Sequence, residues 1–368
     1  DMQLRRLTGL EREKIEAEYE ELLKTIARLK EILDNPKKLD GIIRDELLEI
    51  KEKYADARRT QIVADEGDID EEELIAEEDI VVTITHAGYI KRLPVTAYRS
   101  QRRGGRGITA LATKAEDFVE HLFITSTHSY VAFFTNRGRV YRLKGHEIPE
   151  ASRSARGTAI VNLIPIEQGE RVQAAIPIEA YDEDRFLFMA TRNGVVKKTP
   201  LSEFDSTYSG LIGITLDEDD EMIGVALTDG NQDILLSTRQ GQAIRFSERD
   251  VRPMGRAARG VRGITLEEGD AVVGMDVVTS DRDLLVVTEK GYGKRTPLEE
   301  YRVTGRGGKG IRTINLTDRN GPIVGVKAVH EDDEIMLISH EGIMIRFAVR
   351  DVSRLGRATQ GVRLMRLA

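Results

Sequence analysis

The hydrophobic positions near the start of the chain follow a helical period. Between residues 10 and 33 they recur at steps of four and three, which is the spacing of a coiled-coil seam. These positions are Ile15, Tyr19, Leu22, Ile26, Leu29 and Leu33. Pro36 then suits the first position of a second helix, whose apolar residues continue to Tyr54. We predict two helices, either as a hairpin with one apolar face or as part of an extended coiled coil whose partner helix is missing here.

An acidic stretch separates these helices from the rest. Residues 65–79 contain few side chains that could build a core, which favours a solvated linker over an internal competitor for a basic surface. We therefore expect three parts: a helical segment over 1–62, an acidic linker over 63–78, and a β domain over 79–368.

From residue 79 onward the hydrophobic residues alternate with polar ones, the pattern of half-buried strands. An apolar strand, a glycine turn and a strand ending in basic residues recur about every 50 residues. The turn glycines are Gly88, Gly138, Gly194, Gly241, Gly291 and Gly342. Six such units predict a mostly β protein with six blades in a ring, or else a solenoid of sheets. The ring is preferred because it hides the sheet edges.

Composition and charge limit the classes of function that the chain could have. The chain has 368 residues, no cysteine and a net charge of -8, and it contains no apolar run long enough to span a membrane. The acid is concentrated at the start: residues 1–78 carry 14 basic and 24 acidic side chains, and the remainder carries 41 and 39. The whole-chain charge therefore does not exclude a polyanion as partner of the β domain.

The sharpest motif is the heptapeptide Gln101-Arg102-Arg103-Gly104-Gly105-Arg106-Gly107. Its glycines let the backbone approach another surface closely, and its guanidiniums are suited to phosphate. Basic residues recur beside glycine at the same phase of the later units, except in the third. They are Arg153, Arg156, Arg256, Arg259, Arg262, Arg306, Lys309, Arg312, Arg357 and Arg363. Together they predict a binding surface for nucleic acid.

Basic residues also end the strand that follows each glycine turn. They are Lys91, Arg92, Arg142, Lys197, Lys198, Arg245, Lys294, Arg295 and Arg346. One interpretation is that they only block edge-to-edge pairing of strands. Because equivalent positions of a ring lie on one rim, the alternative is a curved cationic track, and we include them among the expected contacts to nucleic acid.

No catalytic or metal site can be argued from the sequence. The six histidines lack metal-ligand spacing, and residues 305–310 match a dinucleotide fingerprint only in spelling, since a strand rather than a helix is expected after them. Tryptophan is absent and aromatic residues are 5% of the chain, so base stacking is a poor basis for binding. A duplex held by its phosphates is the better expectation.

The heptapeptide resembles the box motif that marks the A subunit of bacterial DNA gyrase, a type IIA topoisomerase. Residues 1–60 resemble the descending helices of that family's coiled coil, and residues 79–368 resemble its six-bladed β-pinwheel. Topoisomerase IV has a similar domain with a degraded box, so the intact box favours gyrase. The corresponding C-terminal domain of topoisomerase IV is one alternative, and a β-propeller that binds proteins is another.

The resemblance implies a non-catalytic fragment that binds and bends double-stranded DNA. Chiral wrapping would let the holoenzyme introduce negative supercoils. The cleavage tyrosine of the family lies upstream of this region, and ATP and Mg²⁺ act through other domains and the B subunit, so no cofactor is expected here. The implied partners are duplex DNA, the B subunit of gyrase, and a second copy of the A subunit, in the cytoplasm at the nucleoid and away from any membrane.

Overall fold

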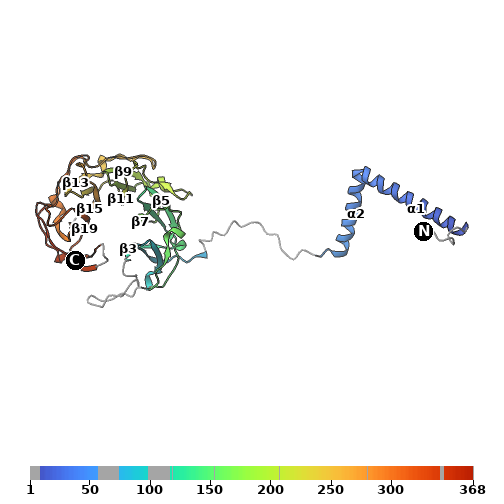
Figure 1. Ribbon diagram of the computed structural model, residues 1–368, viewed down its shortest axis with the longest axis horizontal. Coiled ribbons are helices and arrows are strands. Elements are labelled where there is room, and N and C mark those ends of the chain that lie inside the picture. The colour runs from blue at the N-terminus through green and yellow to red at the C-terminus, as the bar shows by residue number, and fades with distance from the viewer. Residues whose placement is uncertain are drawn as a thin grey trace. The chain divides into compact units, whose positions relative to one another are not determined.

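The computed structural model describes residues 9–56, 74–97, 117, 119–152, 154–206, 208–279, 281–339 and 344–367. The chain separates into two compact units, Asp1–Ile69 and Asp70–Ala368 (Figure 1). The first is helical and the second is almost entirely β, so the predicted change of fold class along the chain is confirmed.

The helical unit consists of α1 (Gly9–Asp34) and α2 (Pro36–Tyr54). Pro36 begins α2 as predicted, and the side chain of Asn35 accepts a hydrogen bond from the Lys37 amide at 3.2 Å, which caps the new helix. The apolar seam of α1 stays open to solvent: Tyr19 is 63% exposed and Leu33 is 74% exposed. The two helices therefore do not bury this seam against each other.

The β unit is built from four-stranded antiparallel sheets, each in the order third strand, first strand, second strand and a short fourth strand. The first two sheets contain β3 (Val119–Ser126), β1 (Asp79–Thr85), β2 (Tyr89–Pro94) and β6 (Thr158–Ala159), then β7 (Val172–Ile178), β4 (Tyr130–Thr135), β5 (Arg139–Lys144) and β10 (Leu211–Ile212). The third contains β11 (Met222–Thr228), β8 (Phe186–Thr191), β9 (Val195–Pro200) and β14 (Val261–Arg262).

The fourth and fifth sheets repeat this pattern. They contain β15 (Val272–Val278), β12 (Asp233–Thr238), β13 (Gln242–Ser247) and β18 (Ile311–Arg312), then β19 (Ile323–Val329), β16 (Asp283–Thr288), β17 (Tyr292–Pro297) and β22 (Val362–Arg363). Short 3-10 turns follow the second strands. They are η3 (Val95–Ala97), η4 (Gly145–Glu147), η6 (Leu201–Phe204), η7 (Glu248–Asp250), η8 (Leu298–Glu300) and η9 (Val349–Asp351), with η5 (Ile160–Asn162) after β6.

Each short fourth strand comes from the following sequence unit. β14, for example, belongs to the unit of β12 and β13 but pairs with β9 of the preceding sheet. Backbone hydrogen bonds of this short strand therefore link neighbouring sheets, in addition to the apolar layers between them. One such layer joins Phe134 of the second sheet to Met189 of the third, as expected for strands whose alternate residues face a core.

The sheets form a propeller-like ring of five blades (Figure 1). The third strands β3, β7, β11, β15 and β19 pack against one another in that order and lie toward the centre, whereas β5, β9 and β13 lie farther out. The short fourth strands, at the opposite edge of each sheet, therefore mark the outer rim.

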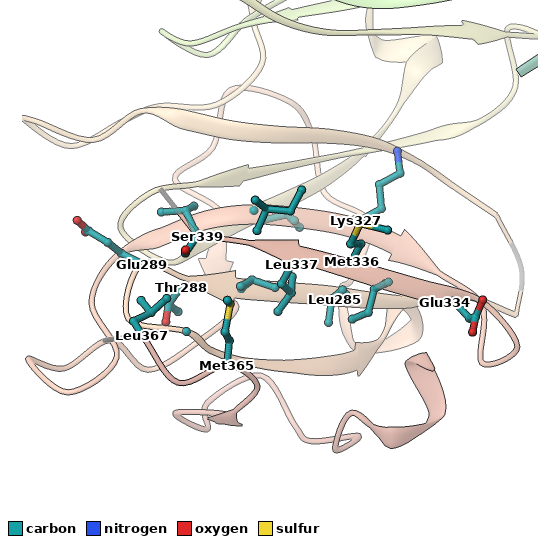
Figure 2. A pocket seen from close by; sticks show the side chains of 17 residues that line it. Leu285, Thr288, Glu289, Lys327, Glu334, Met336, Leu337, Ser339, Met365 and Leu367 are labelled. Atoms are coloured by element: carbon teal, nitrogen blue, oxygen red, sulfur yellow. The ribbon is translucent and has the colours of Figure 1, made fainter. Parts of the chain in front are cut away.

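The expected sixth four-stranded blade is not present among the residues that the structure describes. Its unit lends β22 to the fifth sheet and otherwise forms a two-stranded hairpin, β20 (Glu334–Ile338) and β21 (Met344–Ala348). A hollow of about 730 Å³ lies between this hairpin and the fifth sheet, lined by Leu285, Leu337 and Met365 among others (Figure 2). Beside the hollow, a smaller apolar cluster joins the hairpin to this sheet, with Ile335 and Phe347 packed against the core that contains Leu285.

The third strands of the five sheets pack side by side, and no described strand continues this row beyond β19. A Cβ added to Gly224 would lie 3.4 Å from Met275 of the next third strand, and one added to Gly274 would lie 3.2 Å from Val326. At Gly325 the same position faces open space, and the adjacent Val324 is 54% exposed. Among the described residues, the sixth blade thus has neither a central third strand next to β19 nor a fourth strand on its hairpin.

Candidate functional site

The loops that precede the short fourth strands carry the arginine- and glycine-rich motifs, and we call them box loops. Those described in most detail span residues 255–260, 305–310 and 356–361, in the units of the fourth, fifth and sixth repeats. The first-unit motif, residues 101–107 with Gln101, Arg102, Arg103, Gly104, Gly105, Arg106 and Gly107, lies outside the described residues, as does Arg153. The geometry of the site is therefore built from the later copies.

Each box loop is docked on the sheet before it. Gly310 has a φ of 78°, and an added Cβ would lie 2.6 Å from the carbonyl oxygen of Ala243 on β13. Gly361 has the same relation to Gly293 on β17, at 2.7 Å. Glycine ends the box because only a residue without a side chain can bring the backbone this close to the neighbouring strand.

Buried lysines hold three of these loops in place. Lys294 on β17 donates from Nζ to the carbonyl oxygens of Gly356 and Arg357, at 2.6 and 2.7 Å. Lys197 donates to the Gly213 carbonyl at 2.7 Å and to that of Arg256. Lys91 donates to Ser152 and Ala155 in the second unit, at 3.2 and 3.0 Å. An ammonium group with three donors satisfies carbonyls that the docked loop turns away from solvent.

In four of the five sheets, the next residue along the second strand holds the 3-10 turn of the following unit. The donors reach backbone carbonyls: Arg92 Nε to Ile148 at 2.6 Å, Lys198 Nζ to Glu248 at 2.9 Å, Arg245 NH1 to Leu298 at 3.0 Å and Tyr301 at 3.4 Å, and Arg295 Nε to Val352 at 2.9 Å. Arg245 and Arg295 also pair with the carboxylates of Asp233 and Asp283 on the same sheets. These side chains fasten successive blades together.

Apart from Arg346, the basic residues predicted at the strand ends are consequently corrected from surface contacts to internal clamps. Five of them are buried: Lys91, Lys197 and Lys294 are at most 1% exposed, Lys198 is 4% and Arg295 is 8% exposed. Arg92 and Arg245 are half-buried by the same bonds, and Arg142 stacks on Tyr130 at 4.6 Å and donates to the Tyr181 hydroxyl at 3.0 Å. The repeat that looked like a cationic track is the signature of blade-to-blade docking.

Burial lowers the pKa of the clamping lysines. It lowers the pKa of Lys294 and of Lys197 to about 8, because few solvent dipoles remain to stabilise the charge. It also lowers the pKa of Lys91 and Lys198. Such groups could not serve as freely hydrated phosphate contacts.

Several cations on the box loops and on the short fourth strands that follow them are open to solvent. Arg262 and Arg312 are exposed and Arg256 is partly exposed, and none of the three guanidiniums bonds to another described side chain. Arg259 pairs with Asp217 at 2.9 Å and Lys309 with Glu267 at 3.7 Å, all four side chains being largely exposed. Surface pairs of this kind are weak, so these two cations remain available to a stronger anion.

The last two box loops each contact the segment that directly follows the preceding box loop. Arg306 donates from NH1 to the carbonyl of Arg262 at 3.1 Å, and Arg357 makes the equivalent bond to Arg312 at 3.3 Å. The hydroxyl of Thr265 donates to the Gly307 carbonyl at 2.7 Å. The loops of the fourth, fifth and sixth units thus form a continuous line along the outer rim.

The remaining predicted residues lie apart from this line or at its edge. Arg156 stacks on Tyr89 at 3.7 Å, and Arg346 pairs with Glu334 on the hairpin. Arg363 follows the last box loop and donates to the Tyr292 hydroxyl at 2.9 Å.

The sequence analysis missed several exposed cations. Arg252 and Arg302 each precede a box loop by three residues and bond to no described side chain. Arg319 lies in the turn before β19 and donates to Tyr292 at 3.0 Å. The first two could have been found by extending the repeat alignment toward the 3-10 turns, but Arg319 interrupts the repeat and carries no such signal.

The described residues show neither a metal site nor a membrane-spanning helix. The described ranges contain no cluster of three His, Asp or Glu side chains placed to hold a metal ion. No helix in those ranges is both long and apolar enough to cross a membrane.

Known proteins resemble this chain over its whole length. It is 59% identical over 369 residues to the DNA gyrase A protein of Halalkalibacterium halodurans and 54% identical over 367 residues to that of Clostridium acetobutylicum. Both alignments cover 100% of this chain and 44% of the relative, so the chain spans somewhat under half of their length.

Two solved structures share the fold. One, described as the C-terminal domain of DNA topoisomerase IV, matches with a TM-score of 0.71 and 31% identity over 79% of this chain and 90% of that one. A DNA gyrase A C-terminal domain matches with a TM-score of 0.63 and 28% identity over 79% and 96%.

A family model supplies the assignment. It is the model of the DNA gyrase C-terminal domain, a β-propeller, and it matches six consecutive repeats: residues 79–126, 129–179, 185–229, 232–279, 282–330 and 333–368. With the whole chain also aligned to gyrase A proteins at above 50% identity, the chain belongs to the DNA gyrase A family, its β unit being the C-terminal domain.

Proposed function

We propose that the outer rim of the β unit binds and bends duplex DNA, and that this chain is the DNA-wrapping part of a gyrase A protein. The observation that carries the proposal is the continuous line of box loops, which presents Arg256, Arg262 and Arg312 without internal side-chain partners among the described residues. Guanidiniums placed along a curved edge suit the phosphates of a duplex.

The clamps contribute to this function without touching DNA. Wrapping stiff DNA costs roughly 1–6 kcal/mol for a bend of 40–90° over 20–30 base pairs. A binding surface that deformed in response to this bending energy would not keep the duplex bent. Because Lys197 bonds to the carbonyl of Arg256 and Lys294 to those of Gly356 and Arg357, the box loops of the fourth and sixth units are held to the sheets behind them.

In the whole enzyme, we infer, the wrapped duplex presents a neighbouring segment to the cleavage gate in one sense, which leads to negative supercoils. Gyrase A relatives are more than twice as long as this chain, and we assign strand cleavage to the part of them that it does not cover. ATP and Mg²⁺ would act through those parts and the B subunit. A second copy of the gyrase A protein would complete the assembly, in the cytoplasm.

Salt dependence of binding tests the proposed surface. The double variant Arg262→Gln, Arg312→Gln should bind a 40-base-pair duplex more weakly and reduce the slope of log affinity against log salt by about 1.8, since each lost phosphate contact removes about 0.9. Arg346→Gln, a matched charge change at a residue paired with Glu334, should leave the slope unchanged. No binding by the wild-type chain at moderate salt would contradict the proposal and favour a protein-binding propeller.

A ligation assay tests the role of the first-unit motif. Nicked circles closed by ligase in the presence of the chain should show a shift in linking number. Replacing Arg102, Arg103 and Arg106 by alanine should abolish most of that shift while reducing affinity much less, because the motif is proposed to fix one end of the path. A shift in the triple variant equal to that of the wild type would refute this role.

A further inference from the structure

A second cationic feature lies beyond the last box loop, at the turn end of the fifth sheet. It is a hollow of about 440 Å³, and its described lining includes no carboxylate side chain. The lining residues are Lys290, Tyr292, Arg319, Arg363, Met365, Arg366 and Leu367. Four positively charged side chains thus border one small cavity, which we call the Tyr292 pocket.

The hydroxyl of Tyr292 organises the pocket. Arg319 donates to it from Nε at 3.0 Å and Arg363 from NH2 at 2.9 Å, and each guanidinium also lies 5.4 Å from the ring centre. These two bonds lower the pKa of Tyr292 below its ordinary value, since they favour the tyrosinate. The oxygen that brings the two guanidiniums together belongs to a neutral phenol and not to a carboxylate. This contact therefore does not neutralise their positive charges.

The neighbouring units show that this arrangement is a departure from the repeat. At the equivalent turns Asp217 pairs with Arg259, and Glu267 pairs with Lys309, so acid and base neutralise each other. In the fifth unit Thr317 takes the place of the acid, Arg319 is added, and Gln360 stands where the box cation would be. The ion pair of the neighbouring units is thus absent here, and Arg319 adds a positive charge to the turn.

The nearby acids do not line the pocket. Glu289, which precedes Lys290, pairs with Arg239 of the preceding blade at 3.7 Å. Asp318 contributes its main-chain carbonyl, which accepts from Lys290 Nζ. The ammonium of Lys290 is thereby fixed at the edge of the pocket.

We propose that the Tyr292 pocket binds one backbone phosphate of the wrapped duplex. Arg319 and Arg363 would each grip it through a planar fork, and the Tyr292 hydroxyl, whose oxygen already accepts from both, would donate its proton to a phosphate oxygen. Since Arg363 directly follows the box loop of the sixth unit, the pocket extends the cationic line along β17. The assignment rests on the proposed DNA binding and adds a discrete contact to it.

Binding measurements on the full chain separate this inference from the broader function. Arg319→Gln should weaken binding of a 40-base-pair duplex about 10-fold at 100 mM salt, the order expected for losing one charge-assisted bond, and reduce the salt slope by about 0.9. Arg192→Gln, a matched change at an exposed turn residue near Glu221, should alter neither. Tight DNA binding that is identical in wild type and Arg319→Gln would overturn the pocket and leave the proposed function standing.

The ionisation of Tyr292 gives a second, local readout. In chain labelled with ¹³C at the tyrosine ring and assigned through Tyr292→Phe, this residue should titrate below the ordinary tyrosine pKa. Duplex should raise that pKa, because a nearby phosphate disfavours the tyrosinate, and Arg319→Gln should remove the response.

A titration with inorganic phosphate distinguishes the source of the anion. A response to duplex at micromolar concentration supports a backbone phosphate. A response to inorganic phosphate with none to duplex would overturn the DNA assignment in favour of a free-anion site. No response to either would remove the pocket as a phosphate site.

Discussion

Replacing Gly310 by alanine should detach the box loop of the fifth unit from the fourth sheet. The residue has a φ of 78°, which costs a side-chain-bearing residue about 1–2 kcal/mol, and the new Cβ would lie 2.6 Å from the Ala243 carbonyl oxygen. Forcing atoms into so close a contact adds about 1–3 kcal/mol. We expect urea unfolding of the β unit to show a loss of about 2–5 kcal/mol.

Local exchange measurements show whether the loss occurs where the geometry places it. The amide of Thr313 donates to the Gly241 carbonyl at 2.8 Å, so it should exchange much faster in Gly310→Ala than in the wild type. Gly305→Ala is the matched control: it lies in the same loop, but an added Cβ meets nothing within 4 Å. An equal loss in both variants would contradict the docking role of Gly310.

Much of the fold follows from local patterns. The hydrophobic alternation and the glycine turns, spaced by about 50 residues, identify the strand pairs, and Pro36 marks the second helix. The sequence did not reveal that the sixth unit forms a hairpin and not a four-stranded sheet. The sequence of β20 and β21 resembles that of the other strand pairs, and the difference lies in the strand that would face Gly325.

The candidate site was harder to predict because two roles share one residue type. Lys294 and Arg312 are both cations in repeated positions, yet the first is buried and bonded to two carbonyls and the second is exposed. What separates them is the side of the strand they occupy and the loop laid over it. That loop comes from the next unit, so the decisive contact is between segments about 60 residues apart, as in Lys294 and Arg357.

The sequence does contain a hint in retrospect. At the position of the buried lysine, successive units carry Lys91, Tyr141, Lys197, Ile244 and Lys294. A residue that alternates between lysine and large apolar side chains is typical of a buried position with an occasional polar partner. An exposed phosphate contact would have tolerated Arg or Lys but not Ile.

Lys294→Met should destabilise the β unit and remove a characteristic pH dependence. Methionine keeps most of the volume but leaves the carbonyls of Gly356 and Arg357 without a donor, at about 1–3 kcal/mol each. Loss of the buried charge offsets part of this, so we expect a net decrease of about 1–3 kcal/mol at pH 7. Lys309→Met, the same change at an exposed box residue, should stay within about 0.5 kcal/mol.

The pH dependence identifies the ammonium as the cause. The pKa of Lys294 is 10.5 in the unfolded chain and about 8 in the folded one, so between these values the unfolded state binds more protons. The free energy of unfolding of the wild type should therefore gain up to about 1.4 kcal/mol per pH unit from this lysine as pH rises from 8 to 10, and nothing below pH 8. Urea titrations should show the gap between wild type and Lys294→Met widening over that window, and a gap independent of pH would mean that Lys294 is neutral or solvated throughout.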